Sequence, residues 1–214
     1  MLTYSTFSEL HDKDYIIRGL MKKIENGSAS QRDVDLYSCR IADLKEQWRR
    51  EMGDLTIEEL EDGVDRVNKY AITQREIELK RKGINIKPEA VNPQRSRGND
   101  LVEVLKKEES KYGKPHAEKL RTYYRNANDR FKQHNAALED RAGLAVRITR
   151  LYHPGASAHP CKWCQELAGE YGPRPPSEVF MRHNGCNCEI VVETDRQQTY
   201  YMKASGHAFI KGRR

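Results

Sequence analysis

Residues 161–188 read CKWCQELAGEYGPRPPSEVFMRHNGCNC, and this stretch decides how the C-terminal part of the chain folds. It contains four of the five cysteines and one histidine, at positions Cys161, Cys164, His183, Cys186 and Cys188. Two short ligand pairs joined by a loop can supply a tetrahedral zinc ion without straining either arm. The C-x2-C and H-x2-C-x-C spacings therefore predict a small module that is held together by structural Zn2+.

Five candidate ligands compete for the four positions of such a site. Cys161, Cys164 and Cys188 are the firmest candidates, because Cys188 leads directly into a strand-like run at residues 189–193. The fourth ligand is either His183 or Cys186. Reduced thiols without a metal and a redox-active pair are the alternative interpretations. A catalytic Cys–His pair is the weakest interpretation, since the sequence places no Asn or Asp to orient His183.

The module is expected to cover residues 152–195, because helical periodicity stops at the His-Pro-Gly sequence of residues 153–155. Gly169 and Gly172 permit the chain to reverse, and the prolines between residues 173 and 176 stiffen the loop that leads to the second ligand pair. Ser177 can cap a short helical turn before His183. Four protein ligands leave no position for water or substrate, so the ion would be structural rather than catalytic.

Apolar side chains recur in alternating steps of four and three between residues 120 and 148. A 3.5-residue repeat keeps one helix face against a partner helix. The pattern predicts a long helical segment over residues 100–151, packed as the core of a helical domain or as an intermolecular coiled coil. His134 and Arg141 interrupt the series, which favours an intrachain core with His134 as a hydrogen-bonded core residue. The series is Leu120, Tyr124, Ala127, Phe131, His134, Leu138, Arg141, Ala145 and Ile148.

Residues 1–82 are predicted to form an N-terminal helical hairpin region. Ser30 can cap a helix that ends at Gly53, and Thr56 with Glu59 has the spacing of a capping box. The apolar side chains of these helices, including Trp48, recur every three or four residues and are expected in a core. Two prolines and the loss of periodicity predict a linker or arm over residues 83–99.

The composition is 37% hydrophobic and 33% charged, which suits long solvated helices that each bury one stripe. We therefore expect a mainly α, elongated helical domain followed by a small C-terminal α+β zinc-binding module. No stretch is apolar for long enough to span a membrane, and the start of the chain lacks a signal-peptide pattern. A cytosol-like compartment, in which thiols stay reduced, is expected.

The formal net charge of +6 favours a polyanion or an acidic partner surface. A basic tail is expected at residues 196–214, after the last acidic residue, Asp195. Its weak candidates for contacts with nucleic-acid phosphates are Lys203, Lys211, Arg213 and Arg214. Nothing in the chain predicts a membrane contact or a small-molecule substrate.

Two strings in the cysteine-rich stretch resemble a known family. C-x-W-C-x-x-L-x-G at residues 161–169 and V-F-x-R-H-x-x-C-x-C at residues 179–188 resemble the C-terminal end of minor head proteins of tailed phages and prophages. These are the head morphogenesis proteins related to the minor head protein F of phage Mu. The family's Cys/His positions fall on the five candidate ligands named above, and its glycine falls on Gly169.

The resemblance implies a non-enzymatic, low-copy virion component that contacts the portal or the major capsid protein during head assembly in the host cytoplasm. Packaged DNA would be contacted only through its phosphates. The alternative is a zinc-stabilised DNA-binding protein or an HNH-like nuclease of a mobile element. The sequence lacks the Asp-His start and the further metal ligand that such a nuclease needs. The third hypothesis is a coiled-coil adaptor protein of a mobile element.

Overall fold

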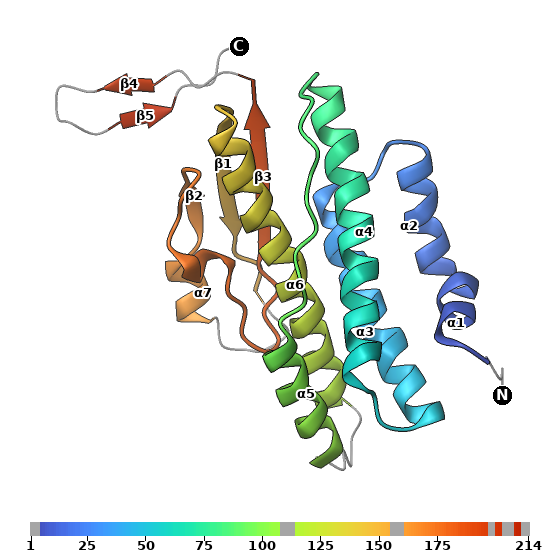
Figure 1. The fold of residues 1–214 in the computed structure, drawn as a ribbon. Coiled ribbons are helices and arrows are strands. Elements are labelled where there is room, and N and C mark those ends of the chain that lie inside the picture. Colours follow the sequence, from blue (N-terminus) through green and yellow to red (C-terminus); the bar gives the residue numbers. More distant parts are fainter. Residues whose placement is uncertain (1–4, 108–113, 155–160, 197–199, 203–207, 211–214) are drawn as a thin grey trace.

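The computed structural model describes residues 5–107, 114–154, 161–196, 200–202 and 208–210. Within these ranges, an N-terminal helical part is followed by a small three-stranded antiparallel sheet, as predicted from composition and periodicity (Figure 1). The helical part contains α1 (Phe7–Lys13), α2 (Tyr15–Glu25), α3 (Gln31–Met52), α4 (Ile57–Arg81), α5 (Arg95–Lys107) and α6 (Lys114–Arg141). The C-terminal part contains β1 (Ala145–Leu151), α7 (Lys162–Glu166), β2 (Gly169–Tyr171), η1 (Ser177–Phe180), β3 (Glu189–Asp195), β4 (Tyr200–Met202) and β5 (Ala208–Ile210).

The start signals of the two long N-terminal helices are confirmed. The Ser30 side chain accepts from the Asp33 amide at the start of α3, and Thr56 and Glu59 form a reciprocal capping box at the start of α4. Gly53 ends α3, and a short connection then reverses the chain, so that α3 and α4 form the expected antiparallel hairpin (Figure 1). The short helix α1 was not predicted.

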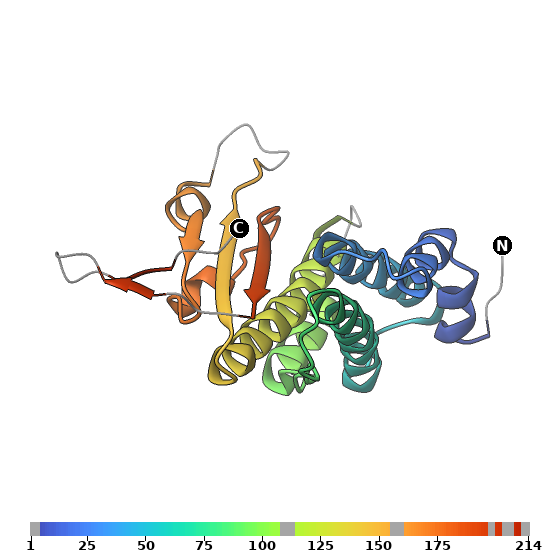
Figure 2. The ribbon, with the colours of Figure 1, turned by 90° about the horizontal axis from the view of Figure 1, so that it is seen from above.

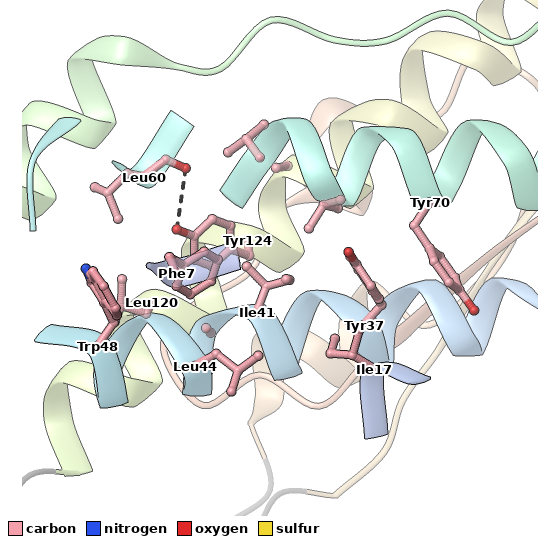
Figure 3. Packing of buried hydrophobic residues seen from close by; sticks show 14 of the residues in the cluster. Phe7, Ile17, Tyr37, Ile41, Leu44, Trp48, Leu60, Tyr70, Leu120 and Tyr124 are labelled. Carbon is pink, nitrogen blue, oxygen red and sulfur yellow. Dashed lines mark hydrogen bonds between the residues drawn. The ribbon is translucent and has the colours of Figure 1, made fainter. Parts of the chain in front are cut away.

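The main hydrophobic core lies where the six helices α1–α6 meet, and Figure 3 shows part of it. Trp48 is buried there as predicted, and its Nε1 donates to Glu59 Oε1 at 2.9 Å. Tyr124 of α6 is fully buried and lies against Gly63 of α4. A Cβ atom at Gly63 would approach the Tyr124 ring to 2.5 Å, so glycine is required for this close contact.

The periodic face of α6 belongs to an intrachain core, which decides between the two packing arrangements expected from the sequence. Buried positions along α6 include Leu120, Tyr124 and Phe131, but the buried face then passes through Asn135 and Glu139. A straight helix drifts relative to a 3.5-residue repeat, so the later seam positions turn away from the core. His134 is accordingly half-buried rather than part of the core, with Nε2 2.9 Å from Glu89 Oε2.

The prediction that the long helical segment extends to residue 151 is wrong beyond Arg141. Gly143 adopts φ 82°, and the Leu144 amide donates to the Glu139 carbonyl at 3.2 Å, which closes the last turn of α6. A left-handed glycine with this hydrogen bond is a common helix terminator. Residues 145–151 form β1 instead, which pairs with both other strands of the sheet.

The predicted linker over residues 83–99 is shorter and more firmly attached than expected. Residues 84–94 are irregular, but α5 already begins at Arg95. The Asn68 side chain donates to the Val91 carbonyl at 2.8 Å, and the Glu89 amide donates to Asn135 at 2.9 Å. Val91 itself is buried. This segment is therefore packed along the helices rather than forming a free arm.

The sheet has the order β2-β1-β3 with antiparallel pairing throughout. The predicted strand at residues 189–193 corresponds to β3. Seen from above, α6 lies between the sheet and helices α3 and α4 (Figure 2). A second apolar cluster joins α6 to the sheet and η1, and consists of Ala136, Val146, Ile148, Val179, Phe180, Ile190 and Val192.

The outer edge of β3 is covered by helix side chains. Gln31 forms hydrogen bonds with the amide and carbonyl of Val192, Lys132 donates to the carbonyl of Ile190, and Lys82 donates to the carbonyl of Thr194. These hydrogen bonds are 2.6–3.0 Å long. Because Ile190, Val192 and Thr194 are alternate residues of β3, the helix side chains occupy the positions that a further strand would use.

Part of the predicted basic tail forms a hairpin, since β4 and β5 pair antiparallel with Tyr201 opposite Phe209. The candidate phosphate contacts Lys203, Lys211, Arg213 and Arg214 lie outside the described residues. None of the described helices has the length and apolar character needed to cross a membrane.

Candidate metal centre

The structure brings all five candidate ligands into one cluster at one end of the C-terminal module. Cys161 and Cys164 lie at the start of α7, while His183, Cys186 and Cys188 lie on the segment between η1 and β3. Two overlapping groups have ligand atoms within 4.8 Å of one another, namely Cys161, Cys164 and His183, and Cys164, Cys186 and Cys188. Cys164 belongs to both groups and is therefore the centre of the cluster.

Burial distinguishes the five side chains. Cys164, Cys186 and Cys188 are buried, Cys161 is half-buried and His183 is exposed. The Nδ1 of His183 lies 2.7 Å from the Asn184 carbonyl, and its Nε2 lies 3.0 Å from Cys164 Sγ. A hydrogen bond from Nδ1–H to the carbonyl leaves Nε2 with the lone pair that a metal would need.

The distances between donor atoms suit a small tetrahedral ion. Cys164 Sγ and Cys186 Sγ are 3.8 Å apart. Tetrahedral zinc with Zn–S bonds of about 2.3 Å requires sulfur atoms about 3.8 Å apart. A nitrogen ligand would lie about 3.6 Å from each sulfur. His183 would thus move outward by roughly half an ångström to bind beside Cys164.

The thiols of the cluster have strongly different proton affinities. A hydrogen bond from Cys188 lowers the pKa of Cys186 to about 4, and the same bond raises the pKa of Cys188. Burial raises the pKa of Cys164 to about 11. Cys186 therefore loses its proton more readily than Cys164 and Cys188, and a divalent ion would displace the protons of the neighbouring thiols.

Arg150 of β1 lies directly behind the cluster and is only 1% exposed. Its Nη2 is 3.9 Å from Cys164 Sγ and 3.8 Å from Cys186 Sγ. Its Nη1 donates to the carbonyls of Val179 and Met181 at 2.5 and 2.9 Å. A buried guanidinium that faces two sulfur atoms offsets the negative charge of thiolates and orients them.

Two further arginines attach the ligand-bearing segment to α6. Arg125 of α6 donates to the carbonyls of both Cys186 and Cys188. Arg182, which directly precedes His183, forms a fully buried ion pair with Asp129 of α6. The positions of the ligands therefore depend on the helical part of the chain.

The sequence identified the five ligand candidates but not the arginines around them. Arg150, Arg125 and Arg182 lie far from one another along the chain, and no spacing rule connects them with the cysteines. Cys39 lies outside the cluster and is half-buried in α3. Burial raises the pKa of Cys39, as expected for an unreactive thiol.

Comparisons with protein-family models, with curated proteins and with solved structures found no match. The donor set and its geometry are consistent with a bound metal ion, and these are properties of the chain itself. The C-terminal module therefore carries a Cys/His cluster of the kind that holds a metal.

Proposed function

We propose that the cluster binds one structural Zn2+ through Cys161, Cys164 and Cys188, with either Cys186 or His183 as the fourth ligand. Thiolate-rich donor sets favour zinc over the harder divalent ions, and four protein ligands close the coordination sphere. The sulfur separation of 3.8 Å between Cys164 and Cys186 supports this choice of ion. A closed site of this kind supplies folding free energy to a module whose own apolar cluster is small.

We further propose that the protein is a structural, non-enzymatic minor head protein of a tailed phage or prophage. The observation that carries the proposal is the convergence of Cys161, Cys164, His183, Cys186 and Cys188 in one cluster. These are the residues on which the resemblance to minor head proteins rests. The protein would act during head assembly in the host cytoplasm, near the portal or the inner face of the capsid, and would remain in the virion.

Complementation of a gene deletion tests this function in the phage or prophage that carries the gene. We expect wild-type protein to restore stable, filled heads and to be detected in purified virions by mass spectrometry. Cys164→Ser should fail in both respects, whereas Cys39→Ser should complement, because Cys39 lies outside the cluster. Normal heads without the gene, or absence of the protein from virions, would contradict the proposal. Magnesium-dependent cleavage of plasmid DNA would instead support the nuclease alternative.

Contact with a partner protein has to be tested with point substitutions rather than with a truncated chain. Residues 1–90 contain α3 and α4, which share the main core with α6, so deleting them would unfold the helical part. Leu36 and Met52 are 50% and 59% exposed and offer apolar contact sites that can be changed without loss of core packing. We expect Leu36→Asp or Met52→Asp to reduce co-purification with the portal or major capsid protein. Unchanged co-purification of both variants would exclude these two positions of α3 as partner contacts.

A further inference from the structure

A cavity of about 220 Å3 lies between the start of α5, the middle of α6 and η1, and its lining contains no acidic side chain. Three arginines line it, namely Arg97 of α5, Arg130 of α6 and Arg182 of the segment after η1. Neutral polar side chains surround them, including Gln94, Asn126 and Gln133. Apolar contact is supplied by η1 and the residue that follows it. This composition distinguishes the cavity from the one beside the cysteine cluster, where Asp43 and Glu118 accompany the arginines.

The positive charge of this cavity is not balanced by neighbouring carboxylates. Arg182 also lines the cavity, but its charge is balanced by the buried carboxylate of Asp129. Arg130 donates to the backbone carbonyl of Asn92 at 3.1 Å. Across the described ranges, neither Arg97 nor Arg130 has a carboxylate oxygen within 4.0 Å. Arg95, two residues before Arg97, is instead paired with Glu58 at 3.3 Å.

The two unbalanced arginines are close enough to affect each other. Burial and the positive charge of Arg97 lower the pKa of Arg130. Arg97 is exposed and Arg130 is half-buried, so solvent screens part of their repulsion, and an anion that contacts both would relieve the rest. The first turn of α5 adds to the positive potential, since amide groups at a helix start have no intrahelical acceptor. Gln94 and Arg97 of this turn both line the cavity.

We propose that this cavity is a binding site for a phosphate group, held between the guanidinium groups of Arg97 and Arg130. A phosphate carries up to two negative charges on several oxygens, so it can accept forked hydrogen bonds from two arginines at once. A carboxylate can balance only one of them. The amide groups of Asn126 and Gln133 provide further donors at the same cavity. This site goes beyond the proposed head function and does not depend on it.

Titration of the zinc-loaded full chain with inorganic phosphate at constant ionic strength tests the proposal. Arginine Nε–Hε resonances are followed by NMR. We expect saturable shifts at Arg97 and Arg130 and none at Arg95. Arg97→Gln should weaken binding at least tenfold, and Arg95→Gln should leave it unchanged. Equal shifts at all three arginines, or binding that survives Arg97→Gln, would overturn the proposal.

Charge reversal gives a second readout that does not depend on ligand affinity. Arg97→Glu supplies the carboxylate that Arg130 lacks, so we expect phosphate binding to be lost and the melting temperature in phosphate-free buffer to rise. A lower melting temperature together with retained phosphate binding would refute the charge argument. Circular dichroism confirms that each variant keeps the helical content of the wild type.

The source of the phosphate is distinguished with a labelled DNA duplex. If the cavity receives a backbone phosphate, Arg97→Gln should weaken duplex binding and reduce the dependence of log Kd on log salt concentration by about 0.9. Arg95→Gln should change this slope less than Arg97→Gln does. Phosphate binding with a duplex affinity that is unaffected by Arg97→Gln would assign the site to a free phosphate or a small phosphoester.

Discussion

Arg150 Nη2 lies 3.8 Å from Cys186 Sγ, in a position where the guanidinium is almost completely removed from solvent. This contact joins the central strand of the sheet to the thiol with the lowest pKa of the cluster. A metal site that contains several thiolates carries excess negative charge, and Arg150 is the cation that the fold places beside it. Arg150 is thus placed to orient the thiols of the cluster.

Substituting Arg150 should weaken zinc binding. We expect Arg150→Met to raise the zinc Kd by about 10- to 100-fold, the range found for partners of metal ligands, and Arg150→Lys to restore part of the loss. The Kd is measured by competition with a chromophoric chelator. Arg147→Met on the same strand is the control, because Arg147 is exposed and paired with Glu193. An unchanged Kd in Arg150→Met would show that the guanidinium has no role at the site.

Removal of the metal should unfold the C-terminal module before the helical part. We expect about one zinc per chain by elemental mass spectrometry. Chelation should remove the dispersed amide signals of residues 161–194 while the helical signal persists, because the main core lies in α1–α6. X-ray absorption at the zinc edge then separates four sulfur ligands from three sulfurs and one nitrogen. Metal-free protein with unchanged spectra would contradict the structural role of zinc.

Breaking the buried pair of Arg182 and Asp129 should be costly. Both side chains are almost completely buried, so Asp129→Asn leaves an unpaired guanidinium in the interior. We expect a loss of about 3–5 kcal/mol in the free energy of unfolding, measured with urea. Glu193→Gln removes the exposed partner of Arg147 and should cost less than about 1 kcal/mol. Equal effects of the two substitutions would show that burial does not control the strength of these pairs.

Asp14 should contribute stability that is lost in acid. Burial alone would raise the pKa of Asp14, but hydrogen bonds from Arg40 and the Ile17 amide outweigh it and lower the pKa below 3.8. A carboxyl with a lowered folded-state pKa stabilises the fold above its unfolded-state pKa. This stability is lost as the pH falls through the folded-state value. Asp14→Asn keeps a capping side chain for α2, so the variant reports the effect of the lost charge alone on stability.

For Asp14→Asn we expect a loss of about 1.5–3 kcal/mol at pH 7, because hydrogen bonds to a charged group are removed. Below about pH 4 the difference from wild type should shrink towards zero. Thermal melts at pH 7, 5 and 3 measure it. Arg40→Gln should reproduce the effect, and the double variant should be no less stable than either single variant. A difference that is constant across this pH range would exclude the ionised pair as its cause.

The helical part and strand β3 could be predicted from local signals, but strands β1 and β2 could not. Ser30 and Thr56 lie at helix starts because their side chains satisfy free amides of the first turn, a property of a few neighbouring residues. The apolar series of α6 continues through Ala145 and Ile148, although these residues belong to β1. Gly143 was the available stop signal, and its left-handed conformation outweighed the apparent continuation of the pattern.

The candidate metal centre was predictable in its ligands and unpredictable in its surroundings. Cys161 and Cys164 sit on one short helical element, so their spacing along the sequence reflects their spacing in the fold. Arg125 reaches the carbonyl groups of residues 186 and 188 from a helix that ends far earlier in the chain. Such contacts depend on how α6 packs against the sheet. This packing cannot be predicted from a local pattern of residues.

The covered edge of β3 also affects how the protein behaves at high concentration. Open strand edges are templates on which chains join into extended sheets and fibres. Here an incoming strand would have to displace Gln31, Lys82 and Lys132 from their carbonyl acceptors and bring its backbone past two lysines. Self-association through this edge is thereby blocked, so the chain can reach high concentration without polymerising along β3.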